Sequence, residues 1–385
     1  MASSSSCDDE DEESIISHYF SRGYKYTAII RFLDKHHGIK MSHRTLKNRL
    51  KKYKIKKKLP SYDLDIIRER VRHELTGPGC QRGYRSMWHM LRLQNIQVPR
   101  QVVADVMREL DPEGCRQRKA RRLERRRYLS PGPNFTWHVD GYDKLKPYGF
   151  PIHGCIDGWS RRIMWLKVAK SNNNPDIIAN FYLDCVSEVG GCPKMIRTDC
   201  GTENGVMAAM QCTFQNEVNA HKYGTSPANQ RIESWWAFYR RSRSSWWMDF
   251  FKNLVENYII NTENELQMEC LWFCFSQLIQ EDLDNVQEQW NTHLIRRSTH
   301  GTISGRPNEL YYLPELHGGE DDLLLPIPDN EVKSMRDNLT YEEEKSCYQE
   351  YFEYVQENTE LQHPSNADEA LELYQSLLET ACKDN

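Results

Sequence analysis

The pattern of apolar and polar residues divides the chain into a helical N-terminal part and a later part that mixes strands with helices. In the first part, apolar residues recur every three or four positions, as on one face of an amphipathic helix. Three helices are expected within residues 14–53, with Gly23 and Gly38 ending the first two and Ser42 capping the third. A second group of helices is expected over about 62–114.

The third helix of the first group has one apolar face and one basic face. At 100° per residue, Leu46 and Leu50 lie on one side. The opposite side carries four polar or basic residues: Arg44, Lys47, Asn48 and Lys51. Three short helices of this kind are typical of a helix-turn-helix DNA-binding unit. The alternative is an ordinary small bundle with a solvated basic face.

The later part begins with three strand-like runs. They cover residues 135–139, which lead into Asp140, then 148–156 and 162–169. The sequence Asp157-Gly158-Trp159-Ser160 between the last two runs is typical of a hairpin turn. The third run is apolar on both faces, which is the pattern of a central strand covered on both sides.

A helix and a fourth strand follow these three runs. Asn174 and Pro175 are suited to the start of the helix, and Gly190 is suited to its end. Residues 195–198 form a short apolar run that leads into Asp199, and we expect this strand to be parallel to the first. Further helical patterns follow over three segments: 254–297, 341–357 and 366–381.

Composition is that of a folded protein with room for a sizeable core. Of 385 residues, 39% are apolar and 28% are charged. No apolar run approaches the ~20 residues that a membrane-spanning helix needs, and residues 1–13 are Ser-rich and acidic, unlike a secretory signal. The twelve cysteines are scattered, and without an export signal we expect them to be reduced thiols. They include no Cys-x2-Cys pair, so we expect no zinc module.

Charge is distributed unevenly along the chain. Residues 14–130 contain 30 Lys and Arg against 10 Asp and Glu, a balance of +20. Residues 315–385 contain 4 against 19, a balance of −15. Such asymmetry points to nucleic acid as the partner of the basic part. The densest run, 116–127, has eight basic residues and could lie along a phosphate backbone or act as a nuclear import signal.

Three acidic residues accompany the strand-like and helix-like runs of the later part. Asp140 and Asp199 end two of the strand-like runs, and Glu233 lies on a helix-like run. Carboxylates placed this way suit hard divalent cations such as Mg²⁺, which takes oxygen ligands. Two such cations can hold the attacking and leaving oxygens of a phosphodiester. One Asp after a strand is usually a cap, so it is the three acids together that predict a metal site.

The sequences around these acids resemble the signatures of the integrase/transposase catalytic core, an RNase H-like fold with an Asp-Asp-Glu triad. The matching pieces are His138-Val139-Asp140, Thr198-Asp199-x-Gly201-x-Glu203-Asn204, and Ser226-Pro227-Ala228-Asn229 with Glu233. Between Asp199 and Glu233 lie 33 residues, a gap similar to that of retroviral and retrotransposon integrases. The resemblance covers about 135–300 and extends to animal integrase-core-domain proteins derived from mobile elements.

The resemblance implies an α/β fold with a mixed five-stranded sheet and flanking helices. The patterns of apolar and charged residues add all-α helix-turn-helix-like units before this fold and an acidic helical tail after it. The resemblance also implies strand cleavage and strand transfer on DNA. Asp140 would bridge two Mg²⁺ or Mn²⁺ ions, Asp199 would hold one and Glu233 the other. The implied partners are DNA and further copies of the chain in a homo-oligomer, with no membrane and no small-molecule substrate. The expected location is the nucleus.

The expected division of the chain follows from these patterns: 1–13 as a disordered acidic tail, 14–59 as a helix-turn-helix-like unit, 60–115 as a second helical unit, 116–134 as a basic linker, 135–300 as the catalytic core and 301–385 as an acidic helical region. Ten residues are expected to contact DNA: Arg44, Lys47, Asn48, Lys51, Arg121, Arg122, Arg125, Arg126, Asn229 and Arg240.

Two other classes of function stay open. The retroviral zinc module and a C-terminal basic β-barrel are both missing from the sequence pattern, which favours a host-retained DNA-binding protein that no longer moves DNA. A nuclease without strand-transfer ability is the third reading. Glu203 is a competing acid near Asp199, and Asp157, before Gly158, is most simply a turn residue.

Overall fold

The computed structural model describes residues 6–55, 62–117, 130–224, 229–297, 303–340, 345–359 and 361–383. Contacts between residues divide the chain into two compact units. The first, here the helical unit, takes in 1–128 and 292–319, and the second, here the sheet unit, takes in 129–291 and 320–385. The boundaries expected from sequence differ from this division and remain predictions.

The first three helices follow the expected order, but the first one begins early. They are α1 (Ser6–Ser21), α2 (Tyr26–His37) and α3 (His43–Lys52). Residues 6–13 were expected to be a disordered tail and are instead the first turns of α1. Within that extension, the Glu12 carboxylate accepts a hydrogen bond from the Tyr53 hydroxyl and pairs with Arg49, each at 2.8 Å. Both partners lie at the end of α3, and these contacts favour the longer helix.

The second helical group contains α4 (Leu64–Thr76), α5 (Tyr84–Leu93), α6 (Arg100–Leu110) and α7 (Pro112–Gln117). Its small core is built on buried side chains such as Val71, Met87 and Val103. The helical unit also includes α13 (Pro307–Tyr312), from a distant part of the sequence. Leu313, directly after α13, is buried in the core of the first three helices.

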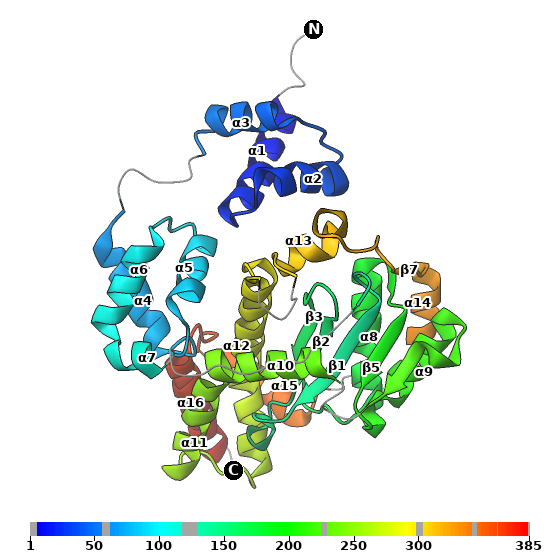
Figure 1. The fold of residues 1–385 in the computed structure, drawn as a ribbon. Coiled ribbons are helices and arrows are strands. Elements are labelled where there is room, and N and C mark those ends of the chain that lie inside the picture. Colours follow the sequence, from blue (N-terminus) through cyan, green and yellow to red (C-terminus); the bar gives the residue numbers. More distant parts are fainter. Residues whose placement is uncertain are drawn as a thin grey trace. The chain divides into compact units, whose positions relative to one another are not determined.

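The sheet unit contains the expected mixed five-stranded sheet (Figure 1). Its strands, in spatial order, are β3 (Ile163–Val168), β2 (Ile152–Asp157), β1 (Thr136–Tyr142), β5 (Met195–Thr198) and β6 (His221–Tyr223). The first three strands pair antiparallel, and β5 runs parallel to both β1 and β6. The parallel relation expected between the first and fourth strand-like runs is therefore confirmed.

Two details of the strands differ from the sequence predictions. Strand β2 begins at Ile152 rather than at Tyr148, because Lys146–Tyr148 forms a short 3-10 helix that Gly149 ends in a left-handed conformation. Strand β1 continues to Tyr142, so Asp140 lies inside the strand and not after it.

Strand β3 was expected at the centre of the sheet and lies instead at its edge. Its apolar residues are nevertheless buried on both faces. The open edge is covered by two side chains of helix α12 (Glu265–Thr292). Asn291 binds the backbone N–H and carbonyl of Ile163, while Gln280 binds the N–H of Val168 and the carbonyl of Leu166, at 2.8 to 3.1 Å. These amides satisfy backbone groups that an edge strand would otherwise present to water.

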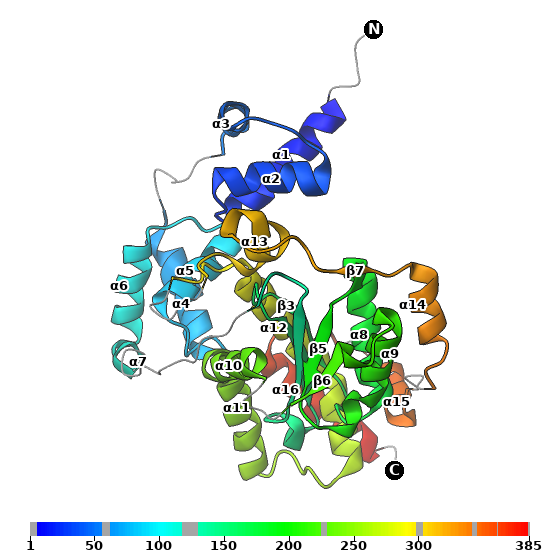
Figure 2. The ribbon, with the colours of Figure 1, turned by 45° about the vertical axis from the view of Figure 1, so that its right-hand side comes forward.

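Helices cover both faces of the sheet (Figure 2). On one side lie α8 (Pro175–Val189) and α9 (Gly205–Gln215), with Asn174 capping α8 and Gly190 ending it as expected. On the other side lie α10 (Gln230–Tyr239), α11 (Ser245–Glu256) and α12. A π-helical segment, Arg240–Ser244, joins α10 to α11. A separate two-stranded sheet pairs β4 (Gly191–Cys192) with β7 (Leu325–Pro326).

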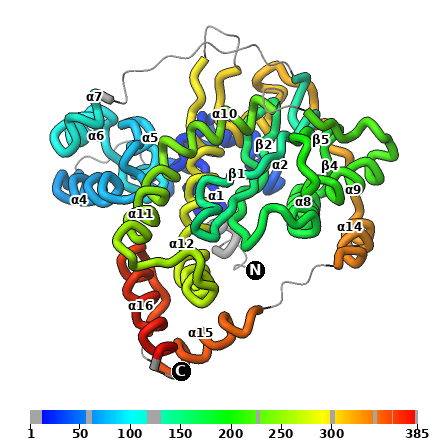
Figure 3. The backbone as a smooth tube through the Cα atoms, turned by 90° about the horizontal axis from the view of Figure 1, so that it is seen from below, coloured from blue at the N-terminus to red at the C-terminus, as the bar shows by residue number. Residues whose placement is uncertain are grey.

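The last three helices, α14 (Asp329–Arg336), α15 (Cys347–Glu357) and α16 (Ala367–Lys383), belong to the sheet unit (Figure 3). The two helices expected near the C-terminus are confirmed, and their apolar faces join the core that α10, α11 and α12 form with the sheet. Phe352, Leu373 and Leu377 are almost completely buried there. No helix within the described ranges has the length and apolar character to cross a membrane.

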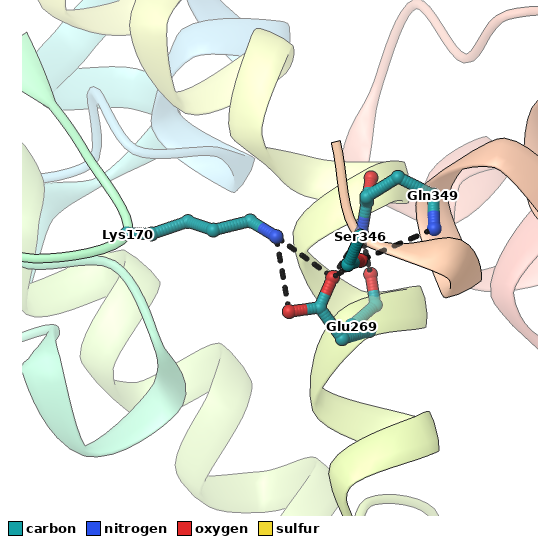
Figure 4. Close-up of polar contacts among 4 residues, drawn as sticks. All are labelled: Lys170, Glu269, Ser346 and Gln349. Carbon is teal, nitrogen blue, oxygen red and sulfur yellow. Dashed lines mark hydrogen bonds and ion pairs between the residues drawn. The ribbon is translucent and has the colours of Figure 1, made fainter. Parts of the chain in front are cut away.

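Glu269 attaches α15 to α12 through a group of polar contacts (Figure 4). Its carboxylate accepts from the Lys170 ammonium at 2.8 and 3.0 Å, from the Ser346 hydroxyl at 2.7 Å and from the Gln349 amide at 2.7 Å. The Gln349 amide also donates to the Glu269 backbone carbonyl at 2.8 Å. Ser346 itself caps α15 by accepting from the Gln349 N–H.

Candidate active site

Asp140 and Asp199 are brought level by the register of two parallel strands. Strand β1 pairs with β5 so that His138 stands opposite Arg197. Extending this register by two residues places Asp140 level with Asp199, which directly follows β5. Residues level with each other on neighbouring strands point to the same face of a sheet. The register of β1 with β5 therefore brings the side chains of Asp140 and Asp199 to the same face of the sheet at the same level.

The segment after Asp199 holds its carboxylate and backbone in place. The Asn204 amide donates to Asp199 Oδ1 at 3.3 Å and to Glu203 Oε1 at 2.9 Å, and its side chain is only 1% exposed. The Thr198 hydroxyl donates to the Asp199 backbone carbonyl at 2.8 Å. Glu203, a competing acid in the sequence, thus shares a hydrogen-bond donor with Asp199.

Glu233 lies in the first turn of α10, and Asn229 attaches the start of that helix to β1. The Asn229 amide nitrogen donates to the carbonyl of Val139 at 2.9 Å, and its oxygen faces His138 Nδ1 at 2.7 Å. Because that oxygen can only accept, His138 carries its proton on Nδ1. The backbone carbonyl of Asn229 accepts a hydrogen bond from the backbone N–H of Glu233 at 3.3 Å. Asn229 alone therefore links Glu233 to the strand of Asp140.

The expectation that Asn229 contacts DNA is corrected by its burial. Its side chain is 0% exposed, and both ends of its amide are taken by β1. Binding DNA would require the amide to leave two buried partners, which costs more than a new contact returns. Asn229 therefore positions the helix that carries Glu233.

Trp236 lies one helical turn after Glu233 and contacts Asp140 directly. Its indole N–H donates to Asp140 Oδ2 at 3.0 Å. The indole ring lies over Gly154, the residue that pairs with Asp140 on β2. Trp236 belongs to none of the three acidic motifs and is 5% exposed. No motif links these residues, because their contact depends on the register of β1 with β2 and on the position of α10.

The electrostatics of Asp140 reflect the neighbouring acids. Burial raises the pKa of Asp140, and repulsion from Glu233 and Asp199 raises it further, from 3.8 to about 7. The hydrogen bonds from Trp236 and from the backbone N–H of Gly141 act in the opposite direction. Glu233 and Asp199 are therefore close enough to Asp140 to disfavour its charged form, and a cation among the three would relieve this repulsion.

The donors at this site fit a hard divalent cation in kind. All three carboxylates offer oxygen, which Mg²⁺ and Mn²⁺ prefer. Within the described ranges, however, no three His, Cys, Asp or Glu side chains are already gathered as a metal site. Asp140 Oδ2 faces Trp236 and Asp199 Oδ1 faces Asn204. Binding of a cation would therefore require the carboxylates to move toward one another, because they are not already arranged as a set of metal ligands.

Two other acids of the sheet unit, Asp157 and Asp143, have structural partners. Asp157 is the expected turn residue, since its Oδ2 accepts from the N–H of Trp159 and from both the N–H and hydroxyl of Ser160. Its Oδ1 also accepts from the N–H of Asn134 at 2.8 Å. Asp143 accepts from the Asn172 amide at 2.6 Å. Neither carboxyl has a contact that links it to Asp140, Asp199 or Glu233.

The remaining residues expected to contact DNA fall into three groups. The four on α3 are exposed: Arg44, Lys47, Asn48 and Lys51. Arg240 is also exposed, and its backbone N–H still bonds the Trp236 carbonyl as in a regular helix, before the π-helical segment that it opens. Four lie outside the described residues: Arg121, Arg122, Arg125 and Arg126. Residues 226–228 of the third acidic motif also lie outside them.

Comparisons with known proteins bear on this site. Residues 127–318 match the protein family described as "Integrase core domain". Among curated proteins, none matches the chain. One similar solved chain comes from the simian T-cell lymphotropic virus intasome in complex with PP2A regulatory subunit B56 gamma. The two chains are 16% identical over 67% of this chain and 79% of that one, with a TM-score of 0.30, and at that score the likeness carries no conclusion.

Proposed function

Over residues 127–318 the chain belongs to the integrase core family, and from this premise we propose that it cleaves DNA strands and joins them to other DNA. The order of the central strands agrees with the RNase H-like fold of that superfamily. In this proposal Asp140, Asp199 and Glu233 form one catalytic site that works with divalent metal ions. The observation that carries it is the convergence of three acids from separate elements: the register of β1 and β5 sets Asp140 level with Asp199, and Asn229 attaches the helix of Glu233 to the strand of Asp140.

Each part of the chain has a role in the proposed reaction. Asp140, Asp199 and Glu233 would hold Mg²⁺ or Mn²⁺, and integrase core domains generally use such ions. The bound metal would activate a water or a DNA 3′-hydroxyl for attack on a phosphodiester and stabilise the developing charge. Asn229 fixes the helix of Glu233, and Asn204 orients Asp199. The proposed number of ions is two, with Asp140 among the residues that would hold them.

The proposal extends to the substrate and the assembly. The balance of +20 over residues 14–130 and the exposed basic face of α3 support binding to DNA phosphates. We further propose that the active form is a homo-oligomer and that it acts in the nucleus. The rival function is a DNA-binding protein that keeps the fold and has lost catalysis. This rival is favoured because, among the described residues, the three carboxylates are not gathered as a metal site.

The test is Asp140→Asn in the full-length protein, which keeps the shape of the side chain and removes its charge. With a supercoiled plasmid and an end-labelled duplex, we expect wild type to nick and join DNA in Mg²⁺ or Mn²⁺. The variant should lose this activity by at least about a thousandfold, while its melting temperature and DNA affinity stay close to those of wild type.

The matched control is Asp143→Asn, three residues away and outside the proposed site. Its activity should stay near that of wild type. Wild-type protein that neither cuts nor joins any DNA offered would support the silent DNA-binding protein. Cleavage without joining would support a nuclease.

A further inference from the structure

We propose that Trp236 is the positioning residue for Asp140, and that Gly154 is glycine because the indole needs the space above it. This inference rests on the proposed function, since it concerns how one of the three acids is prepared for a cation. It assigns a role to a residue that belongs to none of the three acidic motifs.

The geometry joins three elements at one point. Asp140 on β1 is directly paired with Gly154 on β2. A Cβ atom at Gly154 would lie 2.9 Å from Cη2 and 3.2 Å from Cζ2 of Trp236. From that position the indole N–H reaches Asp140 Oδ2 at 3.0 Å. Because Gly154 on β2 has no side chain, the Trp236 ring has room to lie there and to bind Asp140 on β1.

Neighbouring rings prevent the indole from turning away. The ring of Tyr142 lies 5.0 Å from that of Trp236 with an interplanar angle of 32°, and the ring of Trp235 lies 5.0 Å away at 66°. The Tyr142 hydroxyl donates to Ser244 Oγ at 2.9 Å, in the π-helical segment. Trp236 is 5% exposed. A ring packed on several sides holds the Asp140 carboxylate in one orientation.

The chemistry of an indole suits this task. It donates a single hydrogen bond and accepts none, so it occupies only one lone pair of Oδ2 and leaves other lone pairs of the carboxylate for the Gly141 N–H and a cation. It is also neutral, whereas Lys or Arg in its place would oppose binding of a divalent ion by charge repulsion. Groups that orient a metal ligand in this way typically change metal affinity by about 10- to 100-fold when they are lost.

One helix therefore controls two of the three acids. Glu233 and Trp236 are three positions apart on α10, which places them on neighbouring parts of its surface. Asn229 fixes the start of the same helix to β1. Movement of α10 along the sheet would displace Glu233 and release Asp140 together. The proposed cation site thus depends on one docking contact between a helix and a strand.

The test is Trp236→Phe in the full-length protein, which keeps an aromatic ring and removes the N–H. Trp247→Phe is the matched control, because Trp247 is also buried and its indole N–H also donates to an aspartate, Asp282, at 3.1 Å. Mn²⁺ affinity is measured by calorimetry, and melting temperature is measured without metal. We expect Trp236→Phe to weaken Mn²⁺ binding by roughly 10- to 100-fold, and Trp247→Phe to leave it unchanged at a comparable melting temperature.

Gly154→Ala provides a second route, since it keeps Trp236 and displaces its ring. It should weaken Mn²⁺ binding to a similar extent even if Trp236→Phe fails to fold. Wild-type affinity in a folded Trp236→Phe protein, or equal weakening in Trp236→Phe and Trp247→Phe, would overturn the role of Trp236 and leave the proposed function standing. Wild-type protein that binds no Mn²⁺ would overturn both.

Discussion

At the scale of single residues, the candidate site is organised by side chains that are not acidic. Asn229, Asn204 and Trp236 each bind an acid or the backbone beside one, and all three are buried. A buried amide that uses both its ends fixes distance and orientation together. The positions of the carboxylates thus depend on hydrogen bonds made by these three residues, which are not acids and would not bind a cation themselves.

Asn229→Ala should both destabilise the sheet unit and weaken the proposed site. It leaves the Nδ1 proton of His138 and the Val139 carbonyl without their buried partner. Each unsatisfied buried group costs about 1 to 3 kcal/mol, so we expect a loss on the order of 2 to 4 kcal/mol in unfolding free energy. Chemical denaturation measures it, with the exposed Asn338→Ala as control. Equal stability of the two variants would show that Asn229 does not hold α10.

The acids could be found from sequence, and their supporting residues only in part. Asp140, Asp199 and Glu233 stand in short motifs whose spacing is visible in the chain. Asn229 belongs to a motif too, but its role was misassigned, because burial is not visible in a motif. The pairing of Asp140 with Gly154 depends on strand register, and sequence alone placed β2 four residues too early.

At the scale of elements, side chains from helices complete the sheet. Asn291 and Gln280 of α12 satisfy the edge of β3, so an apolar strand can lie at the edge of the sheet. The sequence prediction inferred a central strand from two buried faces. That inference fails because burial of both faces of a strand shows only that layers cover the sheet on both sides. The position of a strand within the sheet depends instead on which other strands it pairs with.

The attachment of α15 should depend on pH through Glu269. Burial acts to raise the pKa of Glu269, but hydrogen bonds from Lys170, Ser346 and Gln349 outweigh it, and the pKa is lowered. A carboxyl with a lowered pKa in the folded state stabilises that state above its unfolded pKa, and the stabilisation is lost as pH falls through the folded value. We therefore expect α15 to loosen in acid, below pH ~4.5.

Glu269→Gln tests this dependence. Hydrogen exchange in α15 should be faster in the variant than in wild type at pH 7, and the difference should disappear in acid. Glu281→Gln, exposed on the same helix, is the control and should behave as wild type. A difference that persists unchanged at pH 3 would mean that the charge of Glu269 does not hold α15.

At the scale of the whole molecule, the acidic C-terminal region is part of the sheet unit from residue 320 on. The balance of −15 over 315–385 would let this region compete with DNA for the basic part of the chain or keep the protein soluble. Helices α15 and α16 also bury apolar side chains in the core that they share with α10, α11 and α12. Sequence predicted the helices but could not predict this packing, because each helix has both an apolar and an acidic face.

Deletion of residues 345–385 should therefore unfold or aggregate the sheet unit. Burial of a large apolar side chain contributes about 1.5 to 3 kcal/mol. The deletion removes several of these, including Phe352, Leu373 and Leu377, which together approach the whole stability of a domain, about 5 to 15 kcal/mol. Solubility and thermal unfolding measure the effect. A folded truncated protein with tighter DNA binding would instead support a competing tail.

The control keeps the fold and changes the charge alone. Glu372 and Glu379 are exposed on α16, so Glu372→Gln with Glu379→Gln should leave stability near that of wild type. DNA affinity of this variant isolates the electrostatic contribution of the C-terminal region from its packing.

The central claim is that Asp140, Asp199 and Glu233 together hold a divalent cation. The most direct measurement is a crystal structure of the full-length protein soaked in Mn²⁺, with anomalous difference density to locate the metal. We expect Mn²⁺ at this site with carboxylate oxygens of Asp140, Asp199 and Glu233 among its ligands, and with the Trp236 indole still donating to Asp140. Density only elsewhere, or a site in which one of the three acids contacts no Mn²⁺, would contradict the claim.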